Sequence, residues 1–186
     1  MATVSQGKET LDDLLREPGR AELIGGRIIR YMAVGHRPNR VAGRIYRALD
    51  DHCEAQRRGV ATTASMGYAV PMLTSGRQSF SPAAAFYDGP LPAIPMRFIE
   101  GPPTLAVEVR SEGDYGPSAL REMAAKRRDY FEAGTAIVWD VDPIAETIAA
   151  YRPANPDAPV IFTRGQAAEA EPVLPGWRAD VNWIFG

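Results

Sequence analysis

The chain has little cysteine and little histidine, and each scarcity excludes a kind of site. Its single cysteine, Cys53, cannot form an internal disulfide and fits a reducing compartment, so we expect a cytoplasmic protein. The two histidines, His36 and His52, do not stand at a spacing typical of a zinc site. A metal ion would therefore need oxygen ligands, which indicates magnesium or manganese.

Long apolar runs and an excess of positive charge are also missing. No run of about 18 apolar residues occurs, so we expect no membrane-spanning segment. The N-terminus carries acidic residues where a secretory signal would have a basic start and an apolar stretch. The formal net charge is −2, so a nucleic-acid-binding protein of this composition needs a local basic patch.

Strand-like and helix-like segments alternate along a chain that is long enough for one domain with a real core. They predict a single-domain α/β (α+β) protein. Residues 1–20 are expected to form an N-terminal helical lead-in, with a short helix near Leu11 to Arg16, and residues 21–186 the domain. Within the domain, Gly25-Gly26 separates two β-rich runs, which is a tight-hairpin signal.

The remaining segments follow from periodicity and from turn residues. Helices are predicted from Asn39 to about Arg57 and from Pro117 to a stop at Gly134. Proline favours an extended connection from Pro90 to Pro103, and the tail from Pro172 is expected to be loop-like with buried Trp177 and Trp183. Strands are predicted at 60–70, 81–87, 104–110, 136–141, 147–152 and 160–164.

Three arginines form a stripe on the first long helix. Arg40, Arg44 and Arg47 stand at positions i, i+4 and i+7, which brings them to one side of a helix. One interpretation is a solvated face. The other is a DNA-binding stripe that contacts phosphates, and the sequence leaves both open.

Glu108 is a carboxylate inside an otherwise apolar strand, where it is costly unless a partner satisfies it. Strand alternation places Leu105 and Val107 on one face, and Ala106, Glu108 and Arg110 on the other. A structural salt bridge to a neighbouring arginine and a role as metal ligand are the two interpretations.

Lys126 lies at the border of the buried face of the second long helix. From there its long side chain could cover apolar surface and bring the ammonium to the edge of the sheet. The alternative is an isolated, exposed lysine.

Several short fragments of the sequence form a pattern, and their joint order and spacing are more specific for a protein family than any one fragment alone. They are residues 21–27, 40–49, 81–83, 106–111, Lys126 with Tyr130, 133–134, 138–143 and 173–176. In this order and spacing they resemble the Uma-two family of restriction endonucleases, within the PD-(D/E)XK nuclease superfamily. The resemblance extends over roughly residues 11 to 186.

The resemblance implies a restriction-endonuclease-like fold, with a mixed β-sheet core flanked by helices, and hydrolysis of DNA phosphodiester bonds with Mg²⁺ or Mn²⁺. It assigns Glu108 as the strand carboxylate that holds the metal and Lys126 as the catalytic lysine. Glu22 matches a family glutamate and is a further acid near the metal. Arg110 occupies the superfamily's usual lysine position; it cannot act as a base because its pKa stays above about 12, but it could bind a DNA phosphate.

The chain departs from the family where the first metal-binding aspartate is expected. That position, after Pro82, is Ala83, although its neighbours fit the family. Two hypotheses follow: an endonuclease that is impaired or inactive, and a catalytically dead module that binds nucleic acid or a protein. A homodimer would let two sites address two DNA strands.

Overall fold

The computed structural model describes residues 8–186, so the first seven residues of the predicted lead-in 1–20 lie outside the described residues. Its centre is a six-stranded sheet in the order β11-β10-β9-β8-β6-β3. Only β8 and β9 pair in parallel, and the other neighbours are antiparallel. The strands are β3 (Val60–Thr63), β6 (Ala84–Tyr87), β8 (Leu105–Val109), β9 (Ile137–Asp142), β10 (Thr147–Arg152) and β11 (Asn155–Phe162). The predicted mixed sheet is confirmed.

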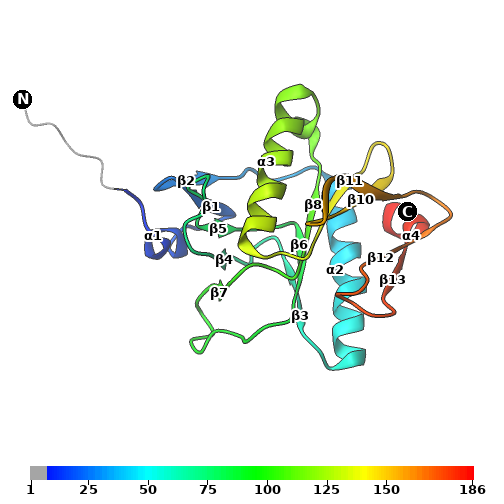
Figure 1. The fold of residues 1–186 in the computed structure, drawn as a ribbon, viewed down its shortest axis with the longest axis horizontal. Helices are drawn as coiled ribbons and strands as arrows, with labels where there is room; N and C mark the ends of the chain where they lie inside the picture. Colours follow the sequence, from blue (N-terminus) through cyan, green and yellow to red (C-terminus); the bar gives the residue numbers. More distant parts are fainter. Residues whose placement is uncertain (1–7) are drawn as a thin grey trace, which may run out of the picture.

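Helices cover both faces of this sheet (Figure 1). On one face lie α2 (His36–Gln56), α4 (Val181–Phe185) and the hairpin of β12 (Ala167–Glu169) and β13 (Arg178–Asp180). On the other face lies α3 (Pro117–Ala133), which with the short helix η1 (Glu112–Asp114) connects the parallel strands β8 and β9. Gly134 ends α3 with a φ of 109°, a backbone conformation that favours glycine.

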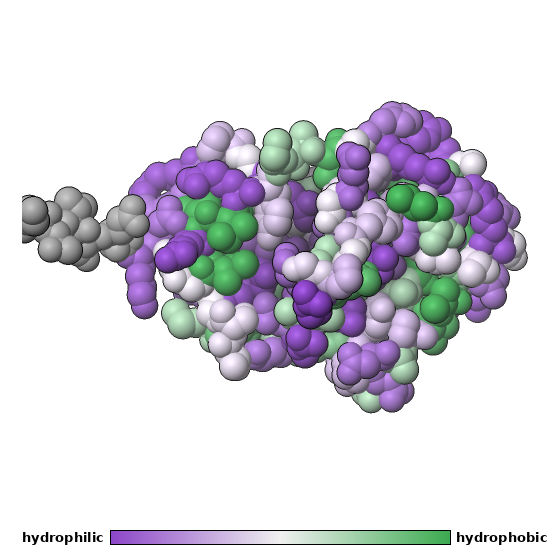
Figure 2. Space-filling view, turned by 90° about the horizontal axis from the view of Figure 1, so that it is seen from above, coloured by the Kyte–Doolittle hydropathy of each residue, from purple (hydrophilic) through white to green (hydrophobic). Residues whose placement is uncertain are grey.

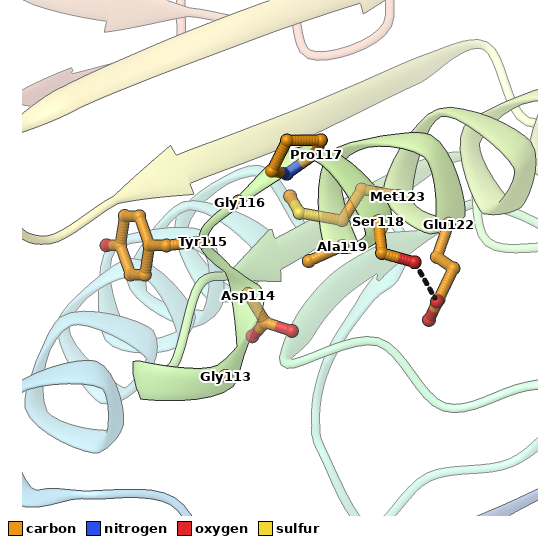
Figure 3. Close-up of a pocket in the computed structure, with 9 residues that line it drawn as sticks. All are labelled: Gly113, Asp114, Tyr115, Gly116, Pro117, Ser118, Ala119, Glu122 and Met123. Atoms are coloured by element: carbon orange, nitrogen blue, oxygen red, sulfur yellow. Dashed lines mark hydrogen bonds between the residues drawn. The ribbon is translucent and has the colours of Figure 1, made fainter.

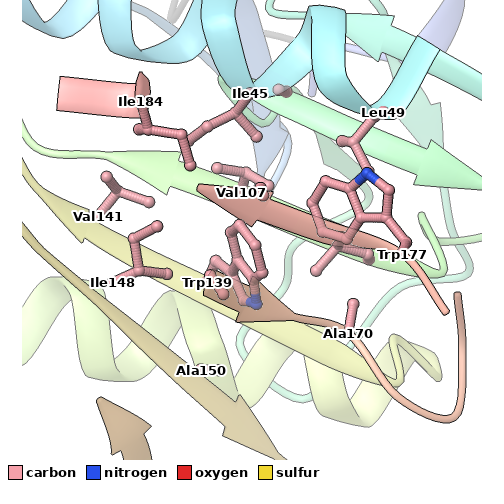
Figure 4. Close-up of a cluster of buried hydrophobic side chains, with 14 of the residues drawn as sticks. Ile45, Leu49, Val107, Trp139, Val141, Ile148, Ala150, Ala170, Trp177 and Ile184 are labelled. Carbon is pink, nitrogen blue, oxygen red and sulfur yellow. The ribbon is translucent and has the colours of Figure 1, made fainter. Parts of the chain in front are cut away.

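The larger core lies between the sheet and α2. Val41, Ile45 and Leu49 of α2 are buried against the sheet, as their helical spacing predicts. Cys53 continues the same buried face one turn further on. In Figure 4, Ile45 and Leu49 point from α2 toward the strands. The rings of Trp139 and Trp177 stack there with centroids 5.3 Å apart.

Two small sheets lie beside α3. The hairpin of β1 (Ala21–Ile24) and β2 (Arg27–Arg30) turns at Gly25 and Gly26, both with positive φ, which confirms the predicted hairpin. The helix α1 (Leu11–Leu15) packs Leu14 against it. A three-stranded sheet contains β4 (Tyr68–Ala69), β5 (Ser79–Phe80) and β7 (Ile99–Glu100).

Three predicted segments are wrong in detail. The run 60–70 is divided between β3 and β4, in different sheets, because a turn follows Thr63. The run 81–87 begins as a strand only at Ala84, after Pro82, which lacks a ladder donor. The tail contains β13 and α4, whose N-terminus is capped by Asp180, and Trp183 is 41% exposed rather than buried.

Among the described residues, none of the helices is both long and apolar enough to span a membrane.

Candidate active site

A cleft of about 550 Å³ opens at the edge of the central sheet on the side of α3. Glu108 of β8 lines it, together with Lys126 and Tyr130 of α3. The segment between β2 and α2 contributes Tyr31 and Met32. The cleft therefore brings together three parts of the chain that are far apart in the sequence.

Lys126 joins two carboxylates in this cleft. Its Nζ lies 2.8 Å from Oε1 of Glu108 and 2.8 Å from Oε1 of Glu22. Burial alone would lower the pKa of Lys126, but the two carboxylates outweigh it and raise the pKa above its ordinary value. Lys126 is thus held as an ammonium cation. The structure brings Lys126, Glu108 and Glu22 together, three residues to which the sequence analysis gave a role in the site.

Glu108 faces α3 as the strand alternation predicts. Its neighbour Ala106 packs in the core on the α3 side, whereas Leu105 and Val107 pack against α2. The hydroxyl of Tyr130 donates a hydrogen bond of 2.7 Å to Oε1 of Glu108. Glu108 is ion-paired with Lys126 and lies 3.5 Å from Arg20, and its role as a metal ligand stays a prediction.

Glu22 is fully buried and surrounded by donors. Its Oε1 accepts from Lys126 and, at 2.9 Å, from the backbone N–H of Ser81. Its Oε2 accepts from the hydroxyl of Tyr31 at 2.7 Å and from the guanidinium of Arg77. Burial alone would raise the pKa of Glu22, but the charges of Lys126 and Arg77 outweigh burial and lower it to about 2.

The β1–β2 hairpin carries Glu22 into this position. Its backbone is tied to the segment around β5, since Gln78 N–H donates to Leu23 C=O at 2.9 Å and Gly25 N–H to Gly76 C=O at 2.8 Å. Arg20, just before β1, donates to the carbonyl of Ser81 and lies 3.5 Å from Glu108. The hairpin thus serves as one wall of the cleft.

Ala83 lies beside Glu108. The register pairs Ala84 of β6 with Val107 of β8, and the Ala83 N–H donates to the Val107 carbonyl at 2.9 Å. Ala83 is the last residue before β6, and Val107, to which it is hydrogen-bonded, directly precedes Glu108 in β8. Ala83 is not among the residues that line the cleft.

Arg110 lines the cleft but is engaged by acids. Its Nε and one terminal nitrogen lie 2.8 and 2.7 Å from the two oxygens of Asp140, and the other terminal nitrogen lies 3.2 Å from Asp142. Its assignment to a DNA phosphate stays a prediction. A phosphate would compete there with a bidentate ion pair.

The arginine stripe is on the other side of the central sheet. Arg40, Arg44 and Arg47 belong to α2, which packs on the face opposite to α3 (Figure 1). Arg44 donates to the Ile184 carbonyl at 3.3 Å and lies over the ring of Trp183. The structure does not bring the stripe to Glu108 and Lys126, and its role in DNA binding stays a prediction.

Sequence reasoning missed two members of the buried network. Arg77 binds both Glu22 and, through its Nε at 2.8 Å, Asp129 of α3. Asp129 stands three residues after Lys126, so helical spacing could have placed it on the same side. Arg77 lies in a polar segment that reads as a surface loop, and no local pattern reports its burial.

A second, smaller pocket of about 360 Å³ lies at the N-terminus of α3 (Figure 3). Ser118 donates to Glu122 there at 3.3 Å, and Asp114 borders the same pocket. These acids oppose the attraction of a helix N-terminus for an anion. The larger cleft is therefore the candidate active site.

The residues of the cleft do not fit a magnesium or manganese site. Such ions take carboxylate oxygens together with water and phosphate. Ala83 offers a methyl group, Glu22 has all its acceptor positions filled, and Glu108 is paired with cations. Within residues 8–186, no group of three or more acids, histidines or cysteines is close enough to hold a metal ion.

The fold is shared with a solved structure. It matches "a putative nuclease belonging to DUF820 from Anabaena variabilis" with a TM-score of 0.74, over 95% of this chain and 97% of that chain, at 18% identity. The family is shown by sequence: the Uma2 model, "Putative restriction endonuclease", matches residues 9–182. The chain belongs to the Uma2 family, as its motifs predict. No curated protein matches it.

The buried state of Glu22 predicts a loss of stability in acid. Its pKa is lowered from 4.5 to about 2 in the folded chain, so its contribution is present above pH 4.5 and is lost as the pH falls toward 2. The shift corresponds to a contribution of Glu22 to the free energy of unfolding on the order of 3 kcal/mol. Urea unfolding at several pH values should therefore show that the parent chain has a higher free energy of unfolding than Glu22→Gln near neutral pH. This difference should shrink as the pH falls. A difference that stays constant from pH 6 to 3 would contradict the assignment.

Proposed function

We propose that this chain is a DNA-directed member of its nuclease family in which phosphodiester hydrolysis is impaired because Ala83 replaces the metal-binding aspartate. The observation that carries the proposal is the contact of 2.8 Å between Lys126 and Glu108 in the cleft, with Ala83 hydrogen-bonded to Val107, the residue before Glu108. The family membership supports a nucleic-acid substrate. The lost carboxylate explains why the cleft does not fit the metal ion that the family resemblance implies.

The side chains in place support a role at a phosphate group. Lys126 holds a positive charge at the surface of the cleft, and Arg20 adds a second cation beside Glu108. Fixed cations stabilise the negative charge that develops on phosphate oxygens during hydrolysis. Because two carboxylates hold Lys126 protonated, its contribution is electrostatic, and it is not a general base in this chain.

The test of the proposal is restoration of the carboxylate. Ala83→Asp should cleave DNA in the presence of manganese at least ~100-fold faster than the parent chain, because charge stabilisation by a metal ion is worth several kcal/mol. Gel assays on plasmid and linear DNA measure the rate. Adding Glu108→Gln to Ala83→Asp should abolish the gain.

A matched control is available in the cleft. Ala33 is exposed and lines the cleft, so Ala33→Asp adds the same charge without placing it at position 83. It should leave cleavage at the level of the parent. If Ala83→Asp does not cleave under any manganese concentration at which it stays folded, the endonuclease proposal fails.

A catalytically dead binding module is the second candidate. It is favoured by the ion pairs that neutralise Glu108 and by the net charge of −2. On the face shown in Figure 2, hydrophobic side chains lie in separate patches divided by hydrophilic ones, which gives a stable protein partner no broad apolar area there. DNA binding by the parent chain without rescued cleavage in Ala83→Asp would favour this alternative.

The arginine stripe gives a separate prediction for DNA binding. If Arg40, Arg44 and Arg47 each contact a phosphate, the log–log dependence of affinity on salt should have a slope of about −2.7, from −0.9 per contact. Replacing all three by glutamine should flatten the slope, measured by fluorescence anisotropy. Replacing the exposed Arg16, Arg121 and Arg178 is the charge-matched control. An unchanged slope in the stripe variant would leave it a solvated face.

We further propose a homodimer, whose two sites would address the two strands of a duplex, and a cytoplasmic location, which rests on the single buried cysteine. Ultracentrifugation at increasing concentration tests the first. Cell fractionation tests the second.

A further inference from the structure

We infer that Glu22 is the positioning residue of the cleft: from the protein interior it anchors Lys126 beside Glu108, and it does not bind a metal ion itself. The inference deepens the proposed function, on which it rests for the role of Lys126 toward DNA. The anchoring itself is a statement about structure and can be tested without any cleavage.

The first argument is that Glu22 has no acceptor position left. A carboxylate offers about four lone-pair sites. Four donors occupy them: Lys126, the Ser81 backbone N–H, the Tyr31 hydroxyl and Arg77. A metal ion could bind only by displacing one of these donors, and each loss would leave a buried polar group unpaired.

The second argument is the difference between the two carboxylates that hold Lys126. The Glu22 side chain is 0% exposed, whereas that of Glu108 is 22% exposed. Glu108 has two close partners, Lys126 and Tyr130, while Arg20 is 3.5 Å away. Glu22 is thus fixed on both oxygens inside the protein, and Glu108 lies at the open side of the cleft.

The third argument is how the anchor is carried. Glu22 belongs to the β1–β2 hairpin, while Lys126 belongs to α3, so their ion pair joins the two walls of the cleft. The rings of Tyr31 and Tyr130 have their centroids 5.5 and 5.8 Å from the ammonium. Without Glu22, the long Lys126 side chain would keep only its ion pair with Glu108, at the solvent-exposed side of the cleft. It would then no longer be held in one orientation.

The composition of the chain makes the test sharp. Only two of its 21 basic side chains are lysines, Lys8 and Lys126, and Lys8 is exposed. Acylation of the folded chain with acetic anhydride at one fixed pH, followed by peptide mass spectrometry, therefore gives the reactivity of Lys126 with Lys8 as an internal reference. The variants are Glu22→Gln, Glu108→Gln and Asp129→Asn.

In Glu22→Gln the ratio of Lys126 to Lys8 acylation should rise about tenfold or more, as expected for the loss of a hydrogen bond to a charged partner. In Glu108→Gln the ratio should rise much less, because Glu22 still holds the ammonium. Asp129→Asn is the matched control: it also removes a buried partner of Arg77 but does not contact Lys126. It should leave the ratio unchanged.

Two outcomes would overturn the inference. An equal rise in Glu108→Gln would mean that Glu22 and Glu108 hold Lys126 alike, so that Glu22 is not the anchor. An equal rise in Asp129→Asn would mean that Glu22 acts only on general stability through Arg77. If Glu22→Gln does not fold, ¹⁵N-lysine NMR of Glu108→Gln decides. An ordered Lys126 ammonium signal supports the anchor at Glu22, and a mobile one contradicts it. Failure of Ala83→Asp to cleave DNA would overturn the proposed function without changing any of these results.

Discussion

Manganese should raise the melting temperature of Ala83→Asp by about 5–10 °C when present at 100 times its dissociation constant, since binding then adds ~2.7 kcal/mol and each kcal/mol shifts a chain of this size by ~2–4 °C. The reason is the family resemblance, which assigns a metal-binding aspartate to position 83, together with the hydrogen bond that joins Ala83 to Val107, next to Glu108. Without metal the two carboxylates repel, so the variant should melt below the parent chain. With metal they become ligands.

The parent chain should hardly respond to manganese, and calorimetry should detect no magnesium binding at micromolar concentrations. Ala33→Asp should behave like the parent, although it adds the same charge. Glu108→Gln on top of Ala83→Asp should remove the response, because one carboxylate then stands alone. A parent chain that melts higher in manganese would contradict the account and would mean that another acid in the cleft binds the ion.

Periodicity was sufficient for the long elements of this fold. The helical spacing of Val41, Ile45 and Leu49 and the almost wholly apolar run at Ala136–Val141 predicted α2 and β9, because a continuous element repeats its buried positions. The strand alternation around Glu108 also gave the correct face. Two-residue strands such as β4 and β5 have no period to detect, so the division of the run 60–70 and the separate strand before residue 81 were missed.

The site could be predicted from the sequence where a charged residue stands among apolar neighbours. Glu108 in an apolar strand and Lys126 at the border of a buried stripe stand out locally, and they lie 2.8 Å apart in the structure. Arg77 was not predictable, because its burial depends on contacts with residues 55 and 52 positions away along the chain. A buried charge in a loop is visible only when the elements that surround it are assembled.

Because Arg77 is buried, its replacement should lower the free energy of unfolding strongly. It is 6% exposed and holds Glu22 and Asp129 at once. Arg77→Met keeps apolar packing against Phe80 but leaves two buried carboxylates with one cation fewer. Removing one partner of a buried ion pair costs ~3–5 kcal/mol, because the remaining charge stays uncompensated. Urea unfolding should show this loss at neutral pH.

An exposed pair gives the comparison. Arg97 lies 2.6 Å from Asp12, but both side chains are more than half exposed, so Arg97→Met should change the free energy of unfolding by only ~0–1 kcal/mol. Within the network, Asp129→Asn combined with Arg77→Met should cost less than the sum of the two single changes, since the double variant buries one fewer unpaired charge. Strict additivity, or a cost for Arg77→Met as small as that for Arg97→Met, would show that the cleft does not depend on this buried ion-pair network.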